Sequence, residues 1–163
     1  MAVKRVSINW NAKLNDSKDL PKYGDSGDGK FSKKFGEGRF VIPAPLEVDA
    51  LMKKVPKGKL TTINELRTAL ASKHKTDFTC PITTGIFSWI AAYAADELAQ
   101  QGRKRITPYW RTLKSDGQIN PKYPGGIEAI REKLEAEGHT VIQKGKRFLV
   151  ENFAKKTIAP KQG

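Results

Sequence analysis

Apolar residues recur at helical spacing in four separate stretches of this chain, which span residues 47–55, 62–74, 82–102 and 125–138. Pro56 ends the first stretch. The second opens with Thr62 three residues before Glu65, a spacing typical of the capping box at a helix start. We therefore predict four helices. The first two are joined by a short polar segment, which is the spacing of a helix-turn-helix.

The third stretch combines large apolar residues with many alanines. The large residues recur along one side, and alanines make much of the remaining surface small: Ile86, Trp89, Ile90 and Tyr93 against Ala91, Ala92, Ala94 and Ala95. We predict a helix that is buried nearly all round or that packs one smooth side closely against a partner. Residues 76–102 contain no Lys or Arg, which counts against an ordinary DNA-recognition helix.

Short strands are predicted around these helices. Residues 39–45 read as a strand or packed connector, residues 106–113 as a strand followed by a hairpin signal at 115–117, and residues 139–153 as two strands around a Lys-Gly-Lys turn. Residues 12–40 are rich in Gly, Asp, Ser and Lys without a sustained period. We therefore predict an α+β, mainly helical protein. It divides into a basic, loosely ordered arm (1–46), a folded domain (47–154) and a basic tail (155–163).

The charge balance favours a polyanionic partner. The 163 residues include 30 Lys and Arg against 17 Asp and Glu, a net charge of +13. The surplus lies mainly near the two ends, in 1–60 and 139–163. Nucleic acid is the first partner that such a charge indicates, an anionic membrane surface is the second, and a basic protein without such a partner is the remaining alternative.

Other features narrow the class of protein. The single cysteine, Cys80, excludes a disulfide framework and fits a reducing compartment. The two histidines, His74 and His139, are too few to form a zinc site with that thiol, so we predict neither a metal nor a cofactor. Neither a run of about 18 apolar residues nor a signal sequence is found, so we expect a cytoplasmic monomer without a membrane partner.

Five motifs occur in an order that resembles the C-terminal domain of the DNA alkyltransferases. They are Val55–Thr62 (VPKGKLTT), Pro108–Arg111 (PYWR), the turn Ser115–Gly117, Tyr123–Gly126 (YPGG), and a helix that ends in Glu137-Gly138. The alkyltransferase family has Pro-Cys-His-Arg at the position of PYWR. The match covers residues 47–140, and the resemblance implies a winged helix-turn-helix-like DNA-binding domain with short β-hairpins.

The resemblance also implies which chemistry has been lost. In the family a cysteine thiolate removes an alkyl group from guanine, aided by a histidine that a glutamate orients. Here Tyr109 and Trp110 replace the thiol and the imidazole, and Glu137 is retained. A phenol with a pKa of about 10 is a poor nucleophile at neutral pH, and an indole nitrogen only donates a hydrogen bond. The chain is therefore similar to the non-catalytic alkyltransferase-like proteins, which mark lesions for other repair proteins.

We therefore predict that the chain binds double-stranded DNA at alkylated or otherwise altered guanine. The predicted DNA contacts are Thr83, Thr84, Gly85, Ser88, Pro108, Tyr109, Trp110, Arg111 and Lys114. Alternatives remain for several of them: Tyr109 and Trp110 are equally suited to core packing, Arg111 to a salt bridge with Glu137 or Asp116, and the hydroxyls of the central helix to helix capping. The alternative functions are methyl transfer to Cys80 and a generic RNA- or protein-binding module.

Overall fold

The computed structural model describes residues 8–160. The elements are α1 (Trp10–Asn15), β1 (Lys22–Asp25), α2 (Lys30–Phe35), β2 (Arg39–Ile42), α3 (Pro45–Met52), β3 (Thr61–Thr62), α4 (Ile63–His74), β4 (Phe78–Thr79), α5 (Pro81–Gln100), the 3-10 helix η1 (Tyr109–Arg111), β5 (Thr112–Leu113), α6 (Gly126–Ala136), β6 (Val141–Lys144), β7 (Arg147–Val150) and α7 (Phe153–Lys156). The protein is α+β and mainly helical, as predicted. In this range no helix is long and apolar enough to cross a bilayer.

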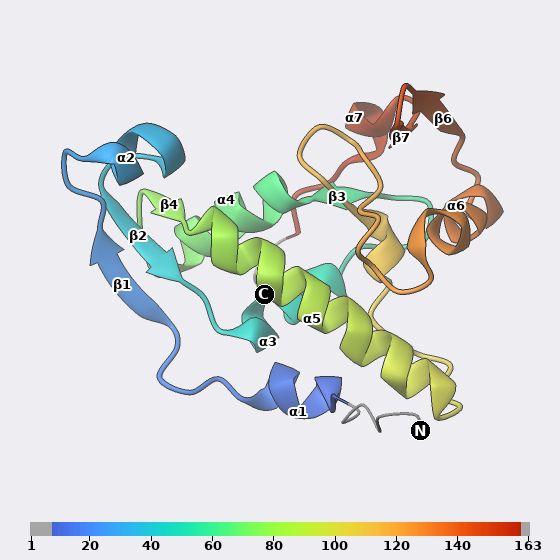
Figure 1. Ribbon diagram of the computed structural model, residues 1–163, viewed down its shortest axis with the longest axis horizontal. Helices are drawn as coiled ribbons and strands as arrows, with labels where there is room; N and C mark the ends of the chain where they lie inside the picture. The colour runs from blue at the N-terminus through green and yellow to red at the C-terminus, as the bar shows by residue number, and fades with distance from the viewer. Residues whose placement is uncertain (1–7, 161–163) are drawn as a thin grey trace, which may run out of the picture.

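The helix α5 crosses the middle of the molecule, with α1 and α3 along one side of it (Figure 1). Its alanines are buried against these two helices, because small side chains allow close packing: Ala91, Ala92, Ala94 and Ala95 are at most 2% exposed. Leucines of α3 and α4 complete the core around them. The alanine side of α5 therefore packs inside the protein's own core and is not free to pack against a partner.

Three small sheets lie around α5. The first has the order β1-β2-β4, with β1 and β2 antiparallel and β2 and β4 parallel. The other two are the parallel pair β3-β5 and the antiparallel hairpin β6-β7. The first sheet and α2 lie at one end of the molecule, and α6 with the β6-β7 hairpin lies at the other (Figure 1). The predicted hairpin within 139–153 is thereby confirmed.

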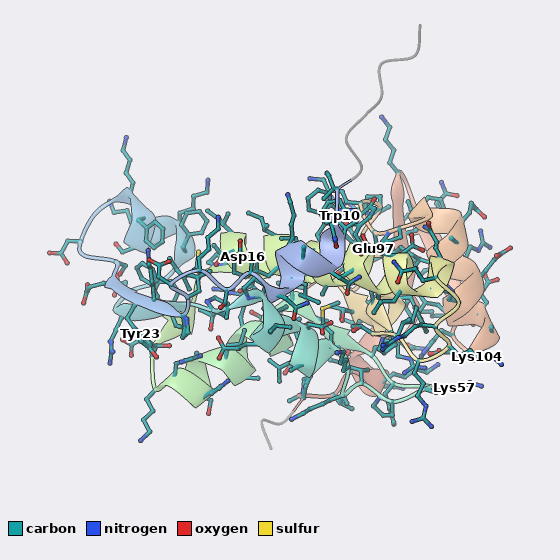
Figure 2. All side chains as sticks on the ribbon, turned by 90° about the horizontal axis from the view of Figure 1, so that it is seen from below. Trp10, Asp16, Tyr23, Lys57, Glu97 and Lys104 are labelled. Atoms are coloured by element: carbon teal, nitrogen blue, oxygen red, sulfur yellow. The ribbon has the colours of Figure 1, made fainter. Side chains whose placement is uncertain are left out.

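The loose order predicted for residues 1–46 is wrong for 8–46, and residues 1–7 lie outside the described part. The six-residue helix α1 is held by Glu97 of α5, whose carboxylate accepts hydrogen bonds from the backbone N–H of Trp10 (2.8 Å) and from Nδ2 of Asn11 (2.8 Å). Figure 2 shows Trp10 and Glu97 close together. These contacts join residues more than 80 positions apart, so the local pattern of the sequence did not reveal them.

A cluster of aromatic rings holds the rest of this segment together. Phe31 and Phe40 lie 5.3 Å apart between ring centroids, and Phe40 lies 5.4 Å from Phe78 of β4. The backbone N–H of Cys80 donates to the carbonyl of Val41 (3.0 Å), which fixes β2 to the start of α5. Residues 22–42 are therefore ordered by contacts with the strand and the helix that follow much later in the chain.

The turn at 115–117 is present, but the predicted hairpin is not. Gly117 has a φ of +88°, and its N–H donates to the carbonyl of Lys114 (2.9 Å). A Cβ at this position would also collide with the ring of Phe153, so both geometry and space require glycine. The chain after the turn returns only as far as Lys114, whose N–H donates to the carbonyl of Gln118 (2.9 Å), and it then meets β7 through a bridge between Gln118 and Leu149. The strand β5 pairs in parallel with β3 instead.

The segment 156–158 pairs with the chain just before β3. The N–H of Leu60 donates to the carbonyl of Lys156 (2.9 Å), and the N–H of Ile158 donates to the carbonyl of Leu60 (2.8 Å). The described part of the basic tail, up to Pro160, is thus attached to the fold by backbone hydrogen bonds.

Candidate nucleic-acid interface

The predicted aromatic cluster lies inside the protein. Tyr109 is only 3% exposed, and its ring makes edge-to-face contacts with Trp110 (5.3 Å) and Tyr123 (6.0 Å). Burial, together with the nearby charge of Asp96, raises the pKa of Tyr109 to about 12. The phenol therefore stays protonated at neutral pH, and the ring packs as part of the core.

Trp110 and Arg111 bind the retained glutamate. Nε1 of Trp110 donates to Glu137 (2.9 Å), while Nε and Nη2 of Arg111 form a two-pronged pair with the same carboxylate (2.8 Å each). Nη1 of Arg111 also donates to the carbonyl of Val55 (2.8 Å). Burial alone would raise the pKa of Glu137, but the hydrogen bonds from Arg111 and Trp110 outweigh it and lower that pKa.

This geometry distinguishes between the alternatives for Arg111. Its guanidinium is engaged by Glu137 and by a backbone carbonyl, so in this structure it joins η1 to the end of α6 and to the segment after α3. The salt bridge considered from the sequence is therefore present. Lys133 lies over the ring of Trp110, 4.8 Å from its centroid. The face of Trp110 is thus covered on this side by a lysine of α6.

The hydroxyl groups at the start of α5 turn back onto their own helix. Thr84 donates to the carbonyl of Cys80 (2.7 Å), and Ser88 donates to the carbonyl of Gly85 (2.8 Å). Both side chains are fully buried. Thr83 is half-buried and donates a long bond to Cys80 (3.4 Å). These hydroxyls therefore shape the first turns of α5 from within.

An open cavity lies between the N-terminal half of α5 and the loop 114–122, and we call it the α5–loop cavity. Its volume is about 390 Å³, and it is lined by Ile82, Gly85, Ile86, Trp89, Lys114, Asn120, Pro121 and Lys122. Trp89 ties its two walls together, because Nε1 of its indole donates to the carbonyl of Lys122 (2.9 Å). None of these described lining residues is acidic. Lys114 and Lys122, at the two ends of the loop, supply positive charge.

The floor of this cavity is apolar and reaches the surface. Ile82 is 51% exposed and Ile86 is 46% exposed, which is unusual for large aliphatic residues on a helix whose other residues up to Leu98 are buried or half-buried. The sequence pattern placed Ile86 and Trp89 on one side of the helix, but this side faces solvent in its first half, while the alanine side faces the core. An apolar side beside lysines is typical of a binding surface.

The predicted contact residues thus fall into two groups. Gly85 and Lys114 line the α5–loop cavity, with Thr84 and Ser88 buried in the same turns of α5. Pro108, Tyr109, Trp110 and Arg111 are not among its lining residues and form the joint between η1 and α6. Sequence reasoning did not include Ile82, Ile86, Trp89 or the loop residues 120–122 among the contacts. The spacing i, i+4, i+7 of the first three, opposite a row of alanines, was the signal available for them.

Cys80 lies apart from the cavity lining. Its side chain is 6% exposed, it precedes the first turn of α5, and its carbonyl accepts the two threonine hydroxyls. Within residues 8–160, no group of three or more His, Cys, Asp or Glu side chains is arranged to hold a metal ion.

No protein-family model and no curated protein matches this chain. Among solved structures, it is similar to S. pombe Atl1 in complex with damaged DNA containing O6-carboxymethylguanine, with 20% sequence identity and a TM-score of 0.49; the match covers 71% of this chain and 94% of that one. A complex of S. pombe ATL with DNA gives 19% identity and a TM-score of 0.48 over the same shares. At this level of similarity, neither complex decides what this chain binds.

Proposed function

We propose that this protein binds double-stranded DNA with the exposed side of α5 and the loop 114–122, and that it holds an altered guanine in the α5–loop cavity without removing the alkyl group. The observation that carries this proposal is the cavity itself. It combines an exposed apolar floor, an indole and two lysines, and it has no acidic residue among its described lining. In this role it would serve DNA repair by marking the lesion.

The dimensions and chemistry of the cavity suit an unstacked base. Its volume of about 390 Å³ lies in the range of about 300–1,000 Å³ that is typical of small-ligand sites. A base leaving the helix needs an apolar surface or aromatic ring against which to pack, and such a contact is worth about 1–3 kcal/mol. Trp89, Ile82 and Ile86 offer this surface, while Lys114 and Lys122 are placed to contact the flanking phosphates.

Binding without transfer is supported by the state of the candidate nucleophiles. The phenol of Tyr109 is enclosed, and its pKa is raised to about 12. The indole N–H of Trp110 is used by Glu137, and an indole has no lone pair with which to accept a proton. The thiol of Cys80 is buried outside the cavity lining. Each group therefore lacks either access or a base.

The test measures affinity and covalent change in the same mixtures. A duplex containing O6-methylguanine, the matched plain duplex and a structured RNA are titrated against the wild-type chain and against the double variant Lys114→Ala/Lys122→Ala. We expect the lesion duplex to bind most tightly. The variant should bind duplex about tenfold more weakly, and its log K against log salt slope should be smaller in magnitude by about two. Intact-mass spectrometry should show an unmodified protein after incubation.

The matched control is Lys57→Ala/Lys59→Ala, which removes the same charge from exposed positions outside the cavity lining. It should change duplex affinity much less than the cavity variant. A gain of one methyl group on Cys80 would show an active methyltransferase instead. Equal affinity for the two duplexes and the RNA would leave only a generic polyanion-binding module.

A further inference from the structure

A second cavity lies on the other side of α5, between this helix, α1, α3 and the segment 103–107. We call it the α1–α5 cavity, and its volume is about 320 Å³. Its lining is mixed: buried alanines of α5 form the apolar part together with Leu14, Leu46 and Ile106, and Asn11, Asn15 and Thr107 are polar. Leu46 is 42% exposed, so the apolar wall continues onto the outer surface.

The rim of this cavity is cationic. Lys53, Arg103 and Arg105 line it, and the acidic residue among its described lining is Asp49. Asp49 is already satisfied, because it accepts a hydrogen bond from the hydroxyl of Thr107 (2.6 Å) and pairs with Lys53 (3.0 Å). Within the described part of the chain, the guanidinium groups of Arg103 and Arg105 have no acidic partner. The rim therefore offers two uncompensated positive charges beside an apolar hollow.

Further cations extend this surface beyond the cavity. Lys57 and Lys104 lie at the same end of the molecule, as Figure 2 shows. The segments that carry them are held together, since Thr107 bonds to Asp49 of α3 and Arg111 bonds to the carbonyl of Val55. A small anion seated in the cavity would leave these outer charges unused, whereas a longer acidic chain would reach them.

We propose that the α1–α5 cavity is a docking site for an acidic segment of a partner protein, which inserts one aliphatic or aromatic side chain between α1 and α5. Acidic residues on either side of this anchor pair with Arg103, Arg105 and the outer lysines. The hollow selects against DNA as the occupant, because a phosphate backbone has no apolar group to fill it. This site goes beyond the proposed DNA binding and does not depend on it.

The position of the cavity leaves the α5–loop cavity free. Ala91, Ala95 and Leu98 of this cavity each follow a residue of the other one (Ile82, Ile86 and Trp89) by nine positions. Nine residues are about two and a half turns of an α-helix, so the two sets face opposite ways. DNA on one side of α5 and a partner segment on the other can therefore bind at the same time.

The test uses the full chain and an array of acidic peptides of about twelve residues, in which one central position is varied through all amino acids. Peptides with leucine, isoleucine or phenylalanine at the centre should bind at least about tenfold more tightly than the serine peptide. Binding should shift the NMR signals of Ala91, Ala95 and Ile106. Arg103→Glu/Arg105→Glu should weaken binding by at least about tenfold.

Two further variants make the result decisive. Leu46→Glu places a repelling charge on the apolar wall at an exposed position, and it should also abolish binding while leaving the fold intact by circular dichroism. Lys144→Glu/Lys146→Glu makes the same charge change on the β6-β7 hairpin and its turn and should leave binding within about twofold. The proposal is overturned if no peptide binds, if the serine and leucine peptides bind equally, if the shifts fall on Ile82 and Ile86, or if plain duplex DNA displaces the peptide.

Discussion

Glu137 has a different use in the structure from the one that the motif resemblance implies. It follows the last turn of α6, where the helix dipole disfavours a carboxylate. Arg111 and Trp110 offset this cost with three short hydrogen bonds. The glutamate thus holds η1 against α6, as a structural joint, while the thiol and imidazole of the family's chemistry are missing.

Removing Arg111 tests this structural use. Arg111→Ala should lower the free energy of unfolding by about 3–5 kcal/mol, because it leaves the carboxylate of Glu137 buried without its charged partner. Urea denaturation measures this change. The control Arg131→Ala breaks the exposed pair with Glu135 and should cost less than about 1 kcal/mol. If Arg111→Ala keeps wild-type stability and loses affinity for duplex DNA, then Arg111 is a phosphate contact after all.

At the scale of single residues, the sequence offered the salt bridge between Arg111 and Glu137 only as one alternative to a DNA contact. The pairing of Arg111 with Glu137 followed from their charges, but its geometry depends on the carbonyl of Val55, which comes from a third segment. The exposure of Ile82 and Ile86 was not predictable, because an apolar row on a helix is usually buried. The packing of α1, α3 and α4 against α5 determines which side of α5 faces solvent.

The helices show which elements a local pattern can reveal. The predicted helices correspond to α3, α4, α5 and α6, all of which contain at least eight residues with a buried side. The shorter α1 and α2 were missed, since a six-residue helix has almost no stability of its own and depends on distant contacts. The strand β4 has two residues and exists because β2 lies beside it.

The helix α1 provides a test at this scale. Glu97→Ala removes the carboxylate that accepts from the backbone N–H groups of Trp10 and Asn11, so the amides of α1 should exchange with solvent at least about tenfold faster. Hydrogen exchange read by NMR measures the effect. Asp96→Ala is the control, because its partner is Gln100 on the same helix. Unchanged exchange would mean that the packing of Trp10 on Trp89 and Tyr93 is sufficient to hold α1.

At the scale of the whole molecule, cations on the surface bear on binding, whereas charged groups inside the fold bear on stability. The net charge of +13 is spread over both ends of the chain, and the two cavities sit on opposite sides of one nearly uncharged helix. The count of charged residues predicted a negatively charged partner, but only the fold shows how the cations are arranged around α5. Inside the protein, His139 after α6 and Lys156 of α7 belong to one partly buried polar cluster.

This cluster predicts that the fold is sensitive to acid. Burial lowers the pKa of His139 below 6.5, and the neighbouring charge of Lys156 lowers it further; Nδ1 of the ring accepts from Nζ of Lys156 (3.4 Å). Since the unfolded chain binds this proton more readily, stability is fully present above pH 6.5 and declines as the pH falls toward the lowered pKa. Glu137, whose pKa is lowered from 4.5, acts in the same sense at lower pH.

The expected result is a melting temperature that falls steadily from about pH 7 to about pH 5, because His139 must become charged in a buried site. His139→Leu should flatten this part of the profile, since the substitution removes the titrating group from a position that is 4% exposed and whose Nε2 has no hydrogen-bond partner among the described residues. Any decline in the melting temperature of this variant at lower pH would then come from carboxylates such as Glu137. Calorimetry of both proteins at constant ionic strength separates these contributions. If the melting temperature falls with pH equally steeply in the variant and the wild type between pH 7 and pH 5, then repulsion among the surface cations, rather than His139, destabilises the fold in acid.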